Sequence, residues 1–334
     1  MSEPTVGTRR VAAIDCGTNS IRLLIADVAQ GTLTDLVREM TVVRLGEGVD
    51  RTGEFSEAAL ERTFDAVDRY AELIREHGME SRHTRFVATS ASRDVQNRAQ
   101  FAAGVSARLG AEPEVISGRE EAELSFAGAA ATSAPELMGR KVLVIDLGGG
   151  STEFVLGEVT RGADGRPRAQ AGAAVSTDMG CVRFTERHLR SDPPTEQEIA
   201  AARAEVLGLL REAGQEVPLE QAEAVVGVAG TVTTITAHAL GLDSYDPARI
   251  DSSELSVEEL RAASESLLRA TREERARLPF MHPGRVDVIG AGSLIWATVL
   301  EHLQQVTGGA VATATASEHD ILDGIALSAG KGEG

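Results

Sequence analysis

The chain has 334 residues, of which 42% are hydrophobic and 25% charged, and it carries a formal net charge of -18. This length and apolar content exclude a disordered or fibrous chain and favour a globular protein of two domains. The acidic balance argues against a protein that binds nucleic acid or a membrane surface through its overall charge, and a polyanionic substrate would need local positive charge.

The first half of the chain alternates strand and helix signals. Residues 11–15 and 21–28 predict two strands, and the turn at 17–19 between them is too short for a crossover helix. Residues 56–77 predict a helix with apolar residues at helical spacing, which ends at Gly78. The elements expected next are a strand at 85–89, a helix at 97–109, a strand at 114–116 and a helix from 117.

The second half begins with the same outline. Residues 142–155 read VLVIDLGGGSTEFV, which predicts a strand, a Gly-rich turn with an acid, and a second strand at 153–159. The polar, Gly-rich segment 161–172 predicts a surface loop. The elements expected after it are helices at 196–212 and 257–276, a strand, turn and helix at 225–240, and a last strand and helix unit at 286–296.

An Asp-x-Gly element followed by small hydroxyl residues occurs twice, at Asp15 and at Asp146. Three consecutive glycines, 148–150, let the backbone approach a ligand closely, and consecutive N–H groups in such a turn form an anion-binding concavity. An aspartate at the strand end can hold a hydrated divalent cation. A single Gly-rich turn also serves as a plain tight connection, but the second copy favours duplicated halves that bind phosphate from two sides of one cleft.

Several motifs together resemble the exopolyphosphatase and guanosine pentaphosphate phosphohydrolase (Ppx/GppA) family, a branch of the actin-like ATPase superfamily. They run in family order along nearly the whole chain. The matching stretches are AAIDCGTNSIRLLIADV from Ala12, FVATSASRDVQN from Phe86, VISGREEAELSFAGA from Val115, VIDLGGGSTEFVLG from Val144, MGCVRFTE from Met179, GVAGTVTTITA from Gly227 and SEHDILDGI from Ser317.

The resemblance implies an α/β fold of two actin-like (ribonuclease H-like) domains with a cleft between them. We expect an N-terminal domain over residues 1–126 and a C-terminal domain over 127–334, with a final helix at 317–330 that packs back on the first domain. The chain is similar to a short, two-domain form of actinobacterial type, without the additional C-terminal helical domains of the longer family members.

The resemblance also implies a reaction, the hydrolysis of a terminal phosphoanhydride bond, and residues that carry it. Glu121 matches the family's catalytic glutamate, Glu153 a second acid, and Arg93 an arginine that grips phosphate oxygens. Asp15 and Asp146 are the metal candidates, for Mg²⁺ or Mn²⁺. The expected phosphate-binding residues are Gly17, Thr18, Asn19, Ser20, Gly148, Gly149, Gly150 and Ser151.

Each assignment has a plainer alternative. Glu121 could lie on a solvated helix face, Glu153 at an ordinary outward strand position, and Arg93 in a salt bridge with Asp94 or another neighbour. Ser117 fits a helix cap better than a ligand. The histidines lack metal-ligand spacing, so no zinc site is expected.

The leading functional hypothesis is an exopolyphosphatase that removes orthophosphate from polyphosphate, with short chains preferred. A guanosine pentaphosphate 5′-phosphohydrolase is the alternative, and a sugar-kinase-type enzyme and a non-catalytic phosphate sensor are more distant ones. We expect a homodimer without nucleic-acid or membrane partners. Two cysteines, no signal-peptide pattern and no apolar run of membrane-spanning length predict a cytoplasmic protein.

Overall fold

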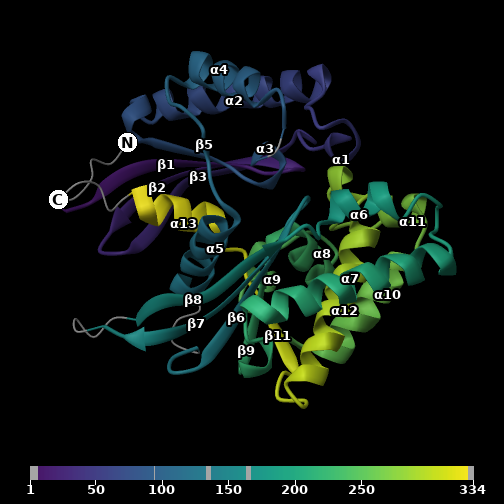
Figure 1. Ribbon diagram of the computed structural model, residues 1–334. Coiled ribbons are helices and arrows are strands. Elements are labelled where there is room, and N and C mark those ends of the chain that lie inside the picture. Colours follow the sequence, from purple (N-terminus) through teal and green to yellow (C-terminus); the bar gives the residue numbers. More distant parts are fainter. Residues whose placement is uncertain (1–6, 94, 133–136, 163–166, 330–334) are drawn as a thin grey trace. The chain divides into compact units, whose positions relative to one another are not determined.

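The computed structural model describes residues 7–93, 95–132, 137–162 and 167–329 (Figure 1). The chain forms two compact units, Met1–Gly128 with Ile321–Gly334 and Ala129–Asp320. Each unit is built on one mixed β-sheet with helices packed on it, which confirms the predicted α/β class.

The sheet of the first unit has the strand order β3-β2-β1-β4-β5. Three antiparallel strands form a meander, and β4 and β5 extend it in parallel to β1. The strands are β1 (Arg9–Cys16), β2 (Ser20–Ala29), β3 (Thr32–Val42), β4 (Thr84–Ala88) and β5 (Glu114–Val115). The helices are α1 (Val49–Thr52), α2 (Glu57–Glu76), α3 (Ser90–Arg93), α4 (Arg98–Leu109), α5 (Gly118–Thr132) and α13 (Ile321–Ala329), with a 3-10 turn at Ser81–His83.

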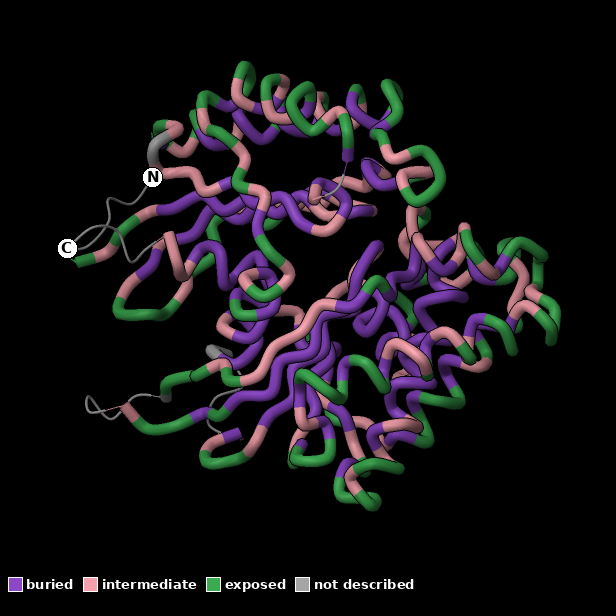
Figure 2. Tube along the Cα trace, viewed as in Figure 1, coloured by how far each residue is buried: buried purple, intermediate pink, exposed green. Residues whose placement is uncertain are grey.

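Successive residues of β1 face opposite sides of this sheet, as the pleat requires. Ala12 and Ile14 pack in the cluster that contains α2 and α4, whereas Val11 and Ala13 pack with α13 and with Leu124 of α5. Figure 1 shows α2 and α4 on one face and α13 on the other, and Figure 2 shows the strands between them buried. Because both faces are covered, β1 is an apolar run rather than an alternating one.

Helix α2 forms for the reasons that its sequence indicates. The Ser56 hydroxyl accepts a hydrogen bond from Ala59 N, and Gly78 follows the helix in the left-handed region with φ 71°. The predicted helix and its end are confirmed.

The sheet of the second unit has the order β10-β11-β9-β6-β7-β8. It repeats the antiparallel meander and parallel extension of the first sheet, and β10 adds an antiparallel edge. The strands are β6 (Lys141–Leu147), β7 (Thr152–Arg161), β8 (Pro167–Thr177), β9 (Ala224–Val228), β10 (Glu254–Ser256) and β11 (Thr313–Ala316). The helices are α6 (Cys181–Arg187), α7 (Glu196–Glu216), α8 (Ala229–Ala239), α9 (Pro247–Ile250), α10 (Val257–Arg269), α11 (Arg272–Ala276) and α12 (Ile289–Val306), with 3-10 turns at Leu219–Gln221 and Pro283–Arg285.

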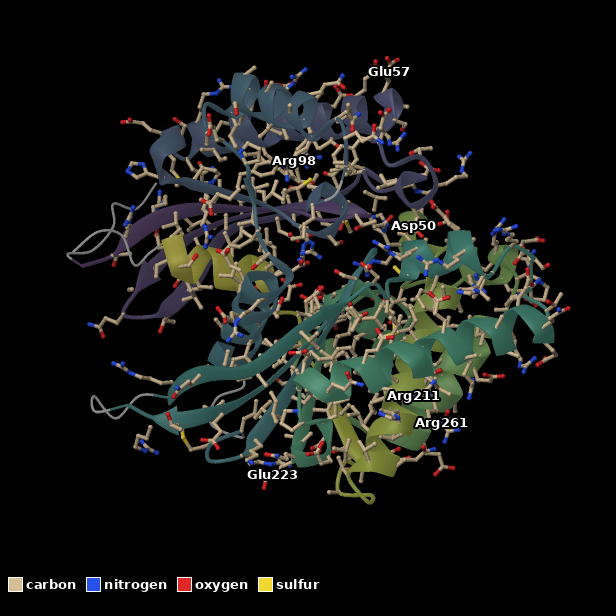
Figure 3. The ribbon with its side chains drawn as sticks, viewed as in Figure 1. Asp50, Glu57, Arg98, Arg211, Glu223 and Arg261 are labelled. Atoms are coloured by element: carbon tan, nitrogen blue, oxygen red, sulfur yellow. The ribbon has the colours of Figure 1, made fainter. Side chains whose placement is uncertain are left out.

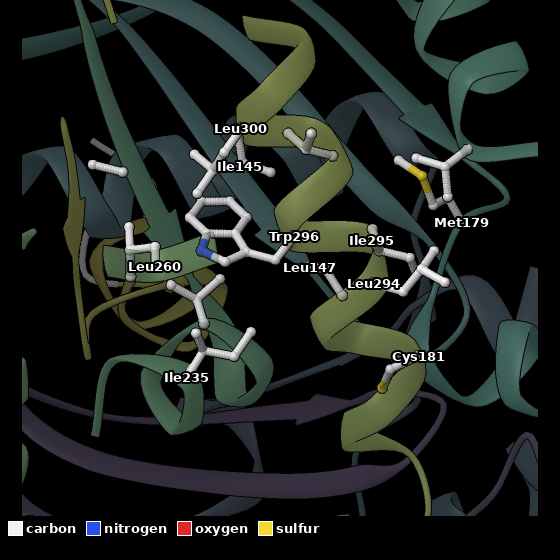
Figure 4. Close-up of a cluster of buried hydrophobic side chains, with 14 of the residues drawn as sticks. Ile145, Leu147, Met179, Cys181, Ile235, Leu260, Leu294, Ile295, Trp296 and Leu300 are labelled. Atoms are coloured by element: carbon white, nitrogen blue, oxygen red, sulfur yellow. The ribbon is translucent and has the colours of Figure 1, made fainter. Parts of the chain in front are cut away.

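Trp296 of α12 lies at the centre of the second core. Its side chain is fully buried, and Figure 4 shows it among Ile145, Ile235, Leu260 and Leu300. The strand residue Gly227 leaves room for the ring, since a Cβ at this position would lie 2.6 Å from Trp296 Cη2. The interpretation of Trp296 as a core residue is therefore confirmed.

Three predictions in the second half were wrong. Segment 161–172 is not a loop throughout, because β8 begins at Pro167 and pairs with β7, and its polar composition reflects an edge strand. The helix expected at 257–276 is two helices, since Thr271 begins a new capping box with Glu274. The strand expected from Val286 is absent from the described chain there, where α12 begins at Ile289.

The chain passes between the two units at two places. The sequence predicts a boundary at residues 126 and 127, and the first unit of the structure runs to Gly128, inside α5. The chain returns at Ile321, and α13 packs on β1, β2 and β4 of the first unit. In the part of the chain that is described, no helix is long and apolar enough to cross a membrane.

We expect Gly227→Ala to lower the free energy of unfolding by about 1–3 kcal/mol, because the added methyl group overpacks the core around Trp296. Val232 Cγ1, 2.9 Å from the new Cβ, leaves no room on the other side. The measurement is urea denaturation. Gly214→Ala in α7 is the matched control, since a Cβ there meets nothing within 4 Å; equal stabilities of the two variants would contradict the packing argument.

Candidate active site

Most charged side chains lie at the surface, as those labelled in Figure 3 do. Among the described residues, few carboxylate side chains belong to residues with less than a tenth of their surface exposed. They are Asp15, Glu121, Asp146, Glu153, Asp320 and Asp323. Four of these are the acids that the sequence predicts for the site. A buried acid needs a compensating partner, so these positions are candidates for chemistry.

The N-terminal end of α6 forms hydrogen bonds with the Gly-rich turn of the second unit. Gly148 N donates a hydrogen bond of ordinary length, 3.0 Å, to Ser151 O, which closes the turn. The carbonyl oxygens of its three glycines accept hydrogen bonds from the start of α6. These bonds run from Cys181 N to Gly148 O (3.1 Å), from Val182 N and Arg183 N to Gly149 O (2.8 and 3.2 Å), and from Arg183 Nε to Gly150 O (2.9 Å).

This arrangement decides where the amide groups of the turn point. In a trans peptide the N–H and C=O point in opposite directions. Because the carbonyl groups of Gly148, Gly149 and Gly150 face α6, the N–H groups of Gly149, Gly150 and Ser151 face the other way. Consecutive N–H groups on one side form an anion-binding concavity. The contact is close, since a Cβ at Gly180 would lie 2.4 Å from the backbone of Gly149.

The turn of the first unit has the same construction. Gly17 N donates to Ser20 O (2.9 Å), the counterpart of the bond from Gly148 to Ser151. The carbonyl oxygens of Thr18 and Asn19 accept from Gly46 N and Arg44 N, both at 2.8 Å. The N–H groups of Asn19 and Ser20 therefore face away from segment 43–46. In each turn the N–H of the first glycine, Gly17 or Gly148, closes the turn and is not among the outward groups. The predicted phosphate-binding role of both turns stays a prediction.

Asp146 and Glu153 are directly opposite each other on neighbouring antiparallel strands. They are 6% and 1% exposed, and Ser176 Oγ donates to Glu153 Oε1 at 2.6 Å. Like charges in a cross-strand pair repel, and burial strengthens the repulsion unless a cation or a proton compensates it. Glu153 is thus not an ordinary outward strand position, and the pair fits one side of a divalent cation.

Asp15 has a different partner. Arg22 is its cross-strand neighbour and donates to Asp15 Oδ2 from Nη2 (2.7 Å) and Nε (3.0 Å). Arg22 follows Asp15 in the chain by as many residues as Glu153 follows Asp146, so Arg22 and Glu153 occupy the same position in the two hairpins. The duplicated hairpins therefore carry opposite charges at this position. An arginine beside a carboxylate reduces its attraction for a dication, which argues against Asp15 as a direct metal ligand.

The acids present can supply part of a metal site. Among the described residues, no group of three or more His, Cys, Asp or Glu side chains has the geometry to hold a metal ion. Two carboxylates with water and phosphate oxygens are, however, the ligand set that Mg²⁺ commonly takes in phosphoryl-transfer sites. Asp146 and Glu153 therefore fit Mg²⁺ bound together with its substrate.

Glu121 lies in the first turn of α5 and is 7% exposed. Arg93 Nη1 donates to Glu121 Oε2 at 2.6 Å, whereas the neighbouring Glu120 points to Arg85 Nη2 at 2.9 Å. Glu121 is therefore not on a solvated face, and the two adjacent glutamates point to different partners, as neighbours on a helix do. The Ser117 hydroxyl accepts from Glu120 N at 3.2 Å, which confirms its interpretation as a cap.

Arg93 forms an ion pair with a predicted catalytic acid, and Asp94, the partner that the plainer alternative named, lies outside the described residues. The predicted role of Arg93 in binding phosphate oxygens stays a prediction. Thr18 Oγ1 lies 3.0 Å from Ser90 Oγ of α3, so the helix that carries Arg93 adjoins the phosphate turn.

Parallel strands bring the predicted residues of the first unit to one edge. Asp15 is the last but one residue of β1, α3 follows β4, and α5 follows β5, so these groups all lie at the carboxyl ends of neighbouring parallel strands. Such an edge is where ligands bind in open α/β sheets.

Cys16 lies beside Asp15 but is fully buried, and burial raises the pKa of its thiol well above the ordinary value, with the Asp15 charge adding to the effect. It is an inert core residue.

Sequence reasoning missed three groups near these edges. The partner of Arg22, Asp15, is set by strand register, and the partner of Arg183, the Gly150 carbonyl, is set by tertiary packing. Neither contact can be predicted from the local sequence. The third group is Tyr245, whose hydroxyl lies 2.7 Å from both Thr233 Oγ1 and Glu318 Oε1. Burial raises the pKa of Tyr245 to about 12 and raises the pKa of Glu318. Only the sequence motif that contains Glu318 could have drawn attention to it.

Comparisons with known proteins agree with these features. A model of the Ppx/GppA phosphatase family matches residues 24–329. Exopolyphosphatase 2 of Mycobacterium tuberculosis is 49% identical over 328 residues, which cover 96% of this chain and 98% of that protein. The crystal structure of an exopolyphosphatase-like protein has a TM-score of 0.90 at 44% identity, with 97% of this chain and 99% of that chain covered.

The Aquifex aeolicus PPX-GPPA enzyme is a more distant structural relative. It has a TM-score of 0.76 at 29% identity, with 96% of this chain and 99% of that chain covered. The resemblance carried by the sequence motifs is confirmed, and the chain belongs to the Ppx/GppA phosphatase family.

Proposed function

We propose that the protein is an exopolyphosphatase, which hydrolyses the terminal phosphoanhydride bond of polyphosphate and releases orthophosphate. The observation that carries the proposal is the buried Glu121 carboxylate beside Arg93, at a sheet edge that also presents an anion-binding turn. The names of its relatives, an exopolyphosphatase and an exopolyphosphatase-like protein, support the same substrate class.

In the proposed reaction, water attacks the terminal phosphorus and the shortened chain leaves. Glu121 orients the water and accepts its proton, and the released phosphate keeps the oxygen of that water. Arg93 holds the Glu121 carboxylate in place through their 2.6 Å contact and supplies positive charge beside the phosphoryl oxygens. The outward N–H groups of both turns bind the oxygens that carry the developing charge.

The proposed cofactor is Mg²⁺, with Mn²⁺ as the alternative. Asp146 and Glu153 would hold it. When bound, it would neutralise charge on the phosphate oxygens and so favour transfer of the phosphoryl group to water. Asp15 is proposed as an outer ligand at most, because Arg22 already neutralises it.

We propose short chains or a nucleotide polyphosphate as substrates rather than chains of hundreds of units. A long polyanion needs a cation for each phosphate that is held, and the net charge of this sequence is -18. Guanosine pentaphosphate is the alternative substrate, since its 5′ terminal phosphate is joined by the same anhydride bond. A homodimer and a cytoplasmic location also stay predictions.

The substrate is tested by phosphate release from short polyphosphate, long polyphosphate and guanosine pentaphosphate with one purified sample. We expect kcat/KM to be highest for short polyphosphate, and a gel time course on long chains to show gradual shortening of the whole population. Full-length chains that persist beside orthophosphate would show processive cutting and contradict the chain-length proposal. Faster release from guanosine pentaphosphate would favour the alternative.

We expect Glu121→Gln to lower kcat by roughly a thousandfold, because the near-isosteric amide cannot accept the proton of the attacking water. Steady-state phosphate release measures it, and circular dichroism checks the fold. Glu123→Gln, on the same helix but exposed and in an ion pair with the exposed Arg119, is the matched control. Near wild-type turnover in Glu121→Gln would remove this residue from the mechanism.

Asp146→Asn should raise the Mg²⁺ concentration needed for half-maximal activity by about tenfold or more, since a neutral amide attracts a dication less than a carboxylate does. Asp15→Asn should change this concentration less, because Arg22 already compensates the Asp15 charge. Metal titrations of activity compare the two variants. A larger effect at Asp15 would place the cation at the other hairpin.

A further inference from the structure

The C-terminal helix α13 touches the backbone of α5 next to Glu121. A Cβ at Gly324 would lie 2.0 Å from Leu124 O and 2.7 Å from Leu124 C, well inside any real contact. Leu124 follows Glu121 by three residues and so lies about one helical turn further along α5. Gly324 thus lets α13 lie directly against α5, one helical turn after the proposed base (Figure 1).

Helix α13 is itself firmly attached to the sheet of the first unit. Ile321, Leu322, Ile325 and Ala326 are buried against β1 and β2. Asp323, 1% exposed, accepts from Arg38 Nη2 at 2.6 Å and from Nη1 at 3.2 Å, a two-pronged contact with β3. A helix fixed in this way is a rigid support for whatever it touches.

A second contact ties α13 and α5 together through one guanidinium. Arg85 of β4 donates from Nη1 to Ser328 Oγ of α13 (2.7 Å) and from Nη2 to Glu120 Oε1 of α5 (2.9 Å). Glu120 precedes Glu121 in the chain. The first turn of α5 is therefore held by Arg85 on one side and by Gly324 one turn later.

We propose that α13 is a positioning element for Glu121, and that Gly324 and Arg85 are the residues through which it acts. The inference rests on the proposed role of Glu121. Neither residue touches the reacting atoms; each fixes α5 along its axis, so that the Glu121 carboxylate meets Arg93 and the attacking water at the required distance. General-base catalysis depends on such placement, because the base must lie within hydrogen-bond reach of the proton that it accepts.

The main variant is Gly324→Ala. The methyl group must push α13 and α5 apart by about 1 Å, a displacement that can cost about 100-fold in rate. We expect kcat to fall by about 100-fold while KM changes less than about threefold, because substrate binding does not use Glu121. Gly208→Ala in α7, where a Cβ meets nothing within 4 Å, is the matched control and should leave both constants unchanged.

A double-mutant cycle separates positioning from general damage. If Gly324 acts through Glu121, the variant Glu121→Gln/Gly324→Ala should be about as slow as Glu121→Gln alone, because nothing remains to be positioned. Single-turnover phosphate release at high enzyme concentration measures this. Multiplied losses would mean that Gly324 acts independently, and they would overturn the proposal, as would normal kcat in Gly324→Ala.

A milder variant keeps the test decisive if Gly324→Ala does not fold. Arg85→Gln removes the guanidinium that bonds Glu120, Ser328 and also Glu114 of β5, without a steric clash. It should lower kcat by about tenfold, again with no further loss in the Glu121→Gln background. Arg119→Gln, an exposed pair partner on the same helix, is its control. Unchanged kcat in Arg85→Gln would overturn the proposal, whereas an active Glu121→Gln would instead refute the role of Glu121 itself.

Discussion

The site depends on one constraint of backbone chemistry. A turn can present several N–H groups to an anion only if its carbonyl groups, which point the opposite way, find other partners. In the second unit α6 supplies these partners, and in the first unit segment 43–46 does so. The close approach of Gly180 to Gly149, and of Gly46 to Thr18, follows from this requirement. Glycines outside the turns are thus as necessary as those within them.

Duplication gives the two hairpins one backbone and different electrostatics. Both place an aspartate at the strand end and close the turn with the same hydrogen bond. The neighbouring strand then contributes Arg22 in one copy and Glu153 in the other, so the cross-strand pair is an ion pair in the first copy and two carboxylates in the second. This difference in charge is the basis for proposing the second hairpin as the metal site.

The position of the proposed base depends on residues far away in the sequence. Helix α5 supplies Glu121, but Arg93 follows β4, and Gly324 and Ser328 come from the last helix. The first unit is therefore incomplete without α13, which also fills the face of the sheet opposite α2 and α4. The same buried contacts that stabilise the first unit are therefore the ones that we propose to position the catalytic acid.

The sequence by itself determined what depends on neighbouring residues. The capped helix after Ser56, the two hairpins with their glycine turns, and the motifs that contain Glu121 and Asp146 follow from local chemistry. Tertiary structure decided the rest. Every residue of α12 from Ile289 to Leu300 is buried, so this part of the helix shows no alternation of buried and exposed positions, and its sequence also fits a buried strand. The pairings of Asp15 with Arg22, of Arg183 with Gly150 and of Gly324 with Leu124 are set by strand register and by packing between distant segments, and no local pattern encodes them.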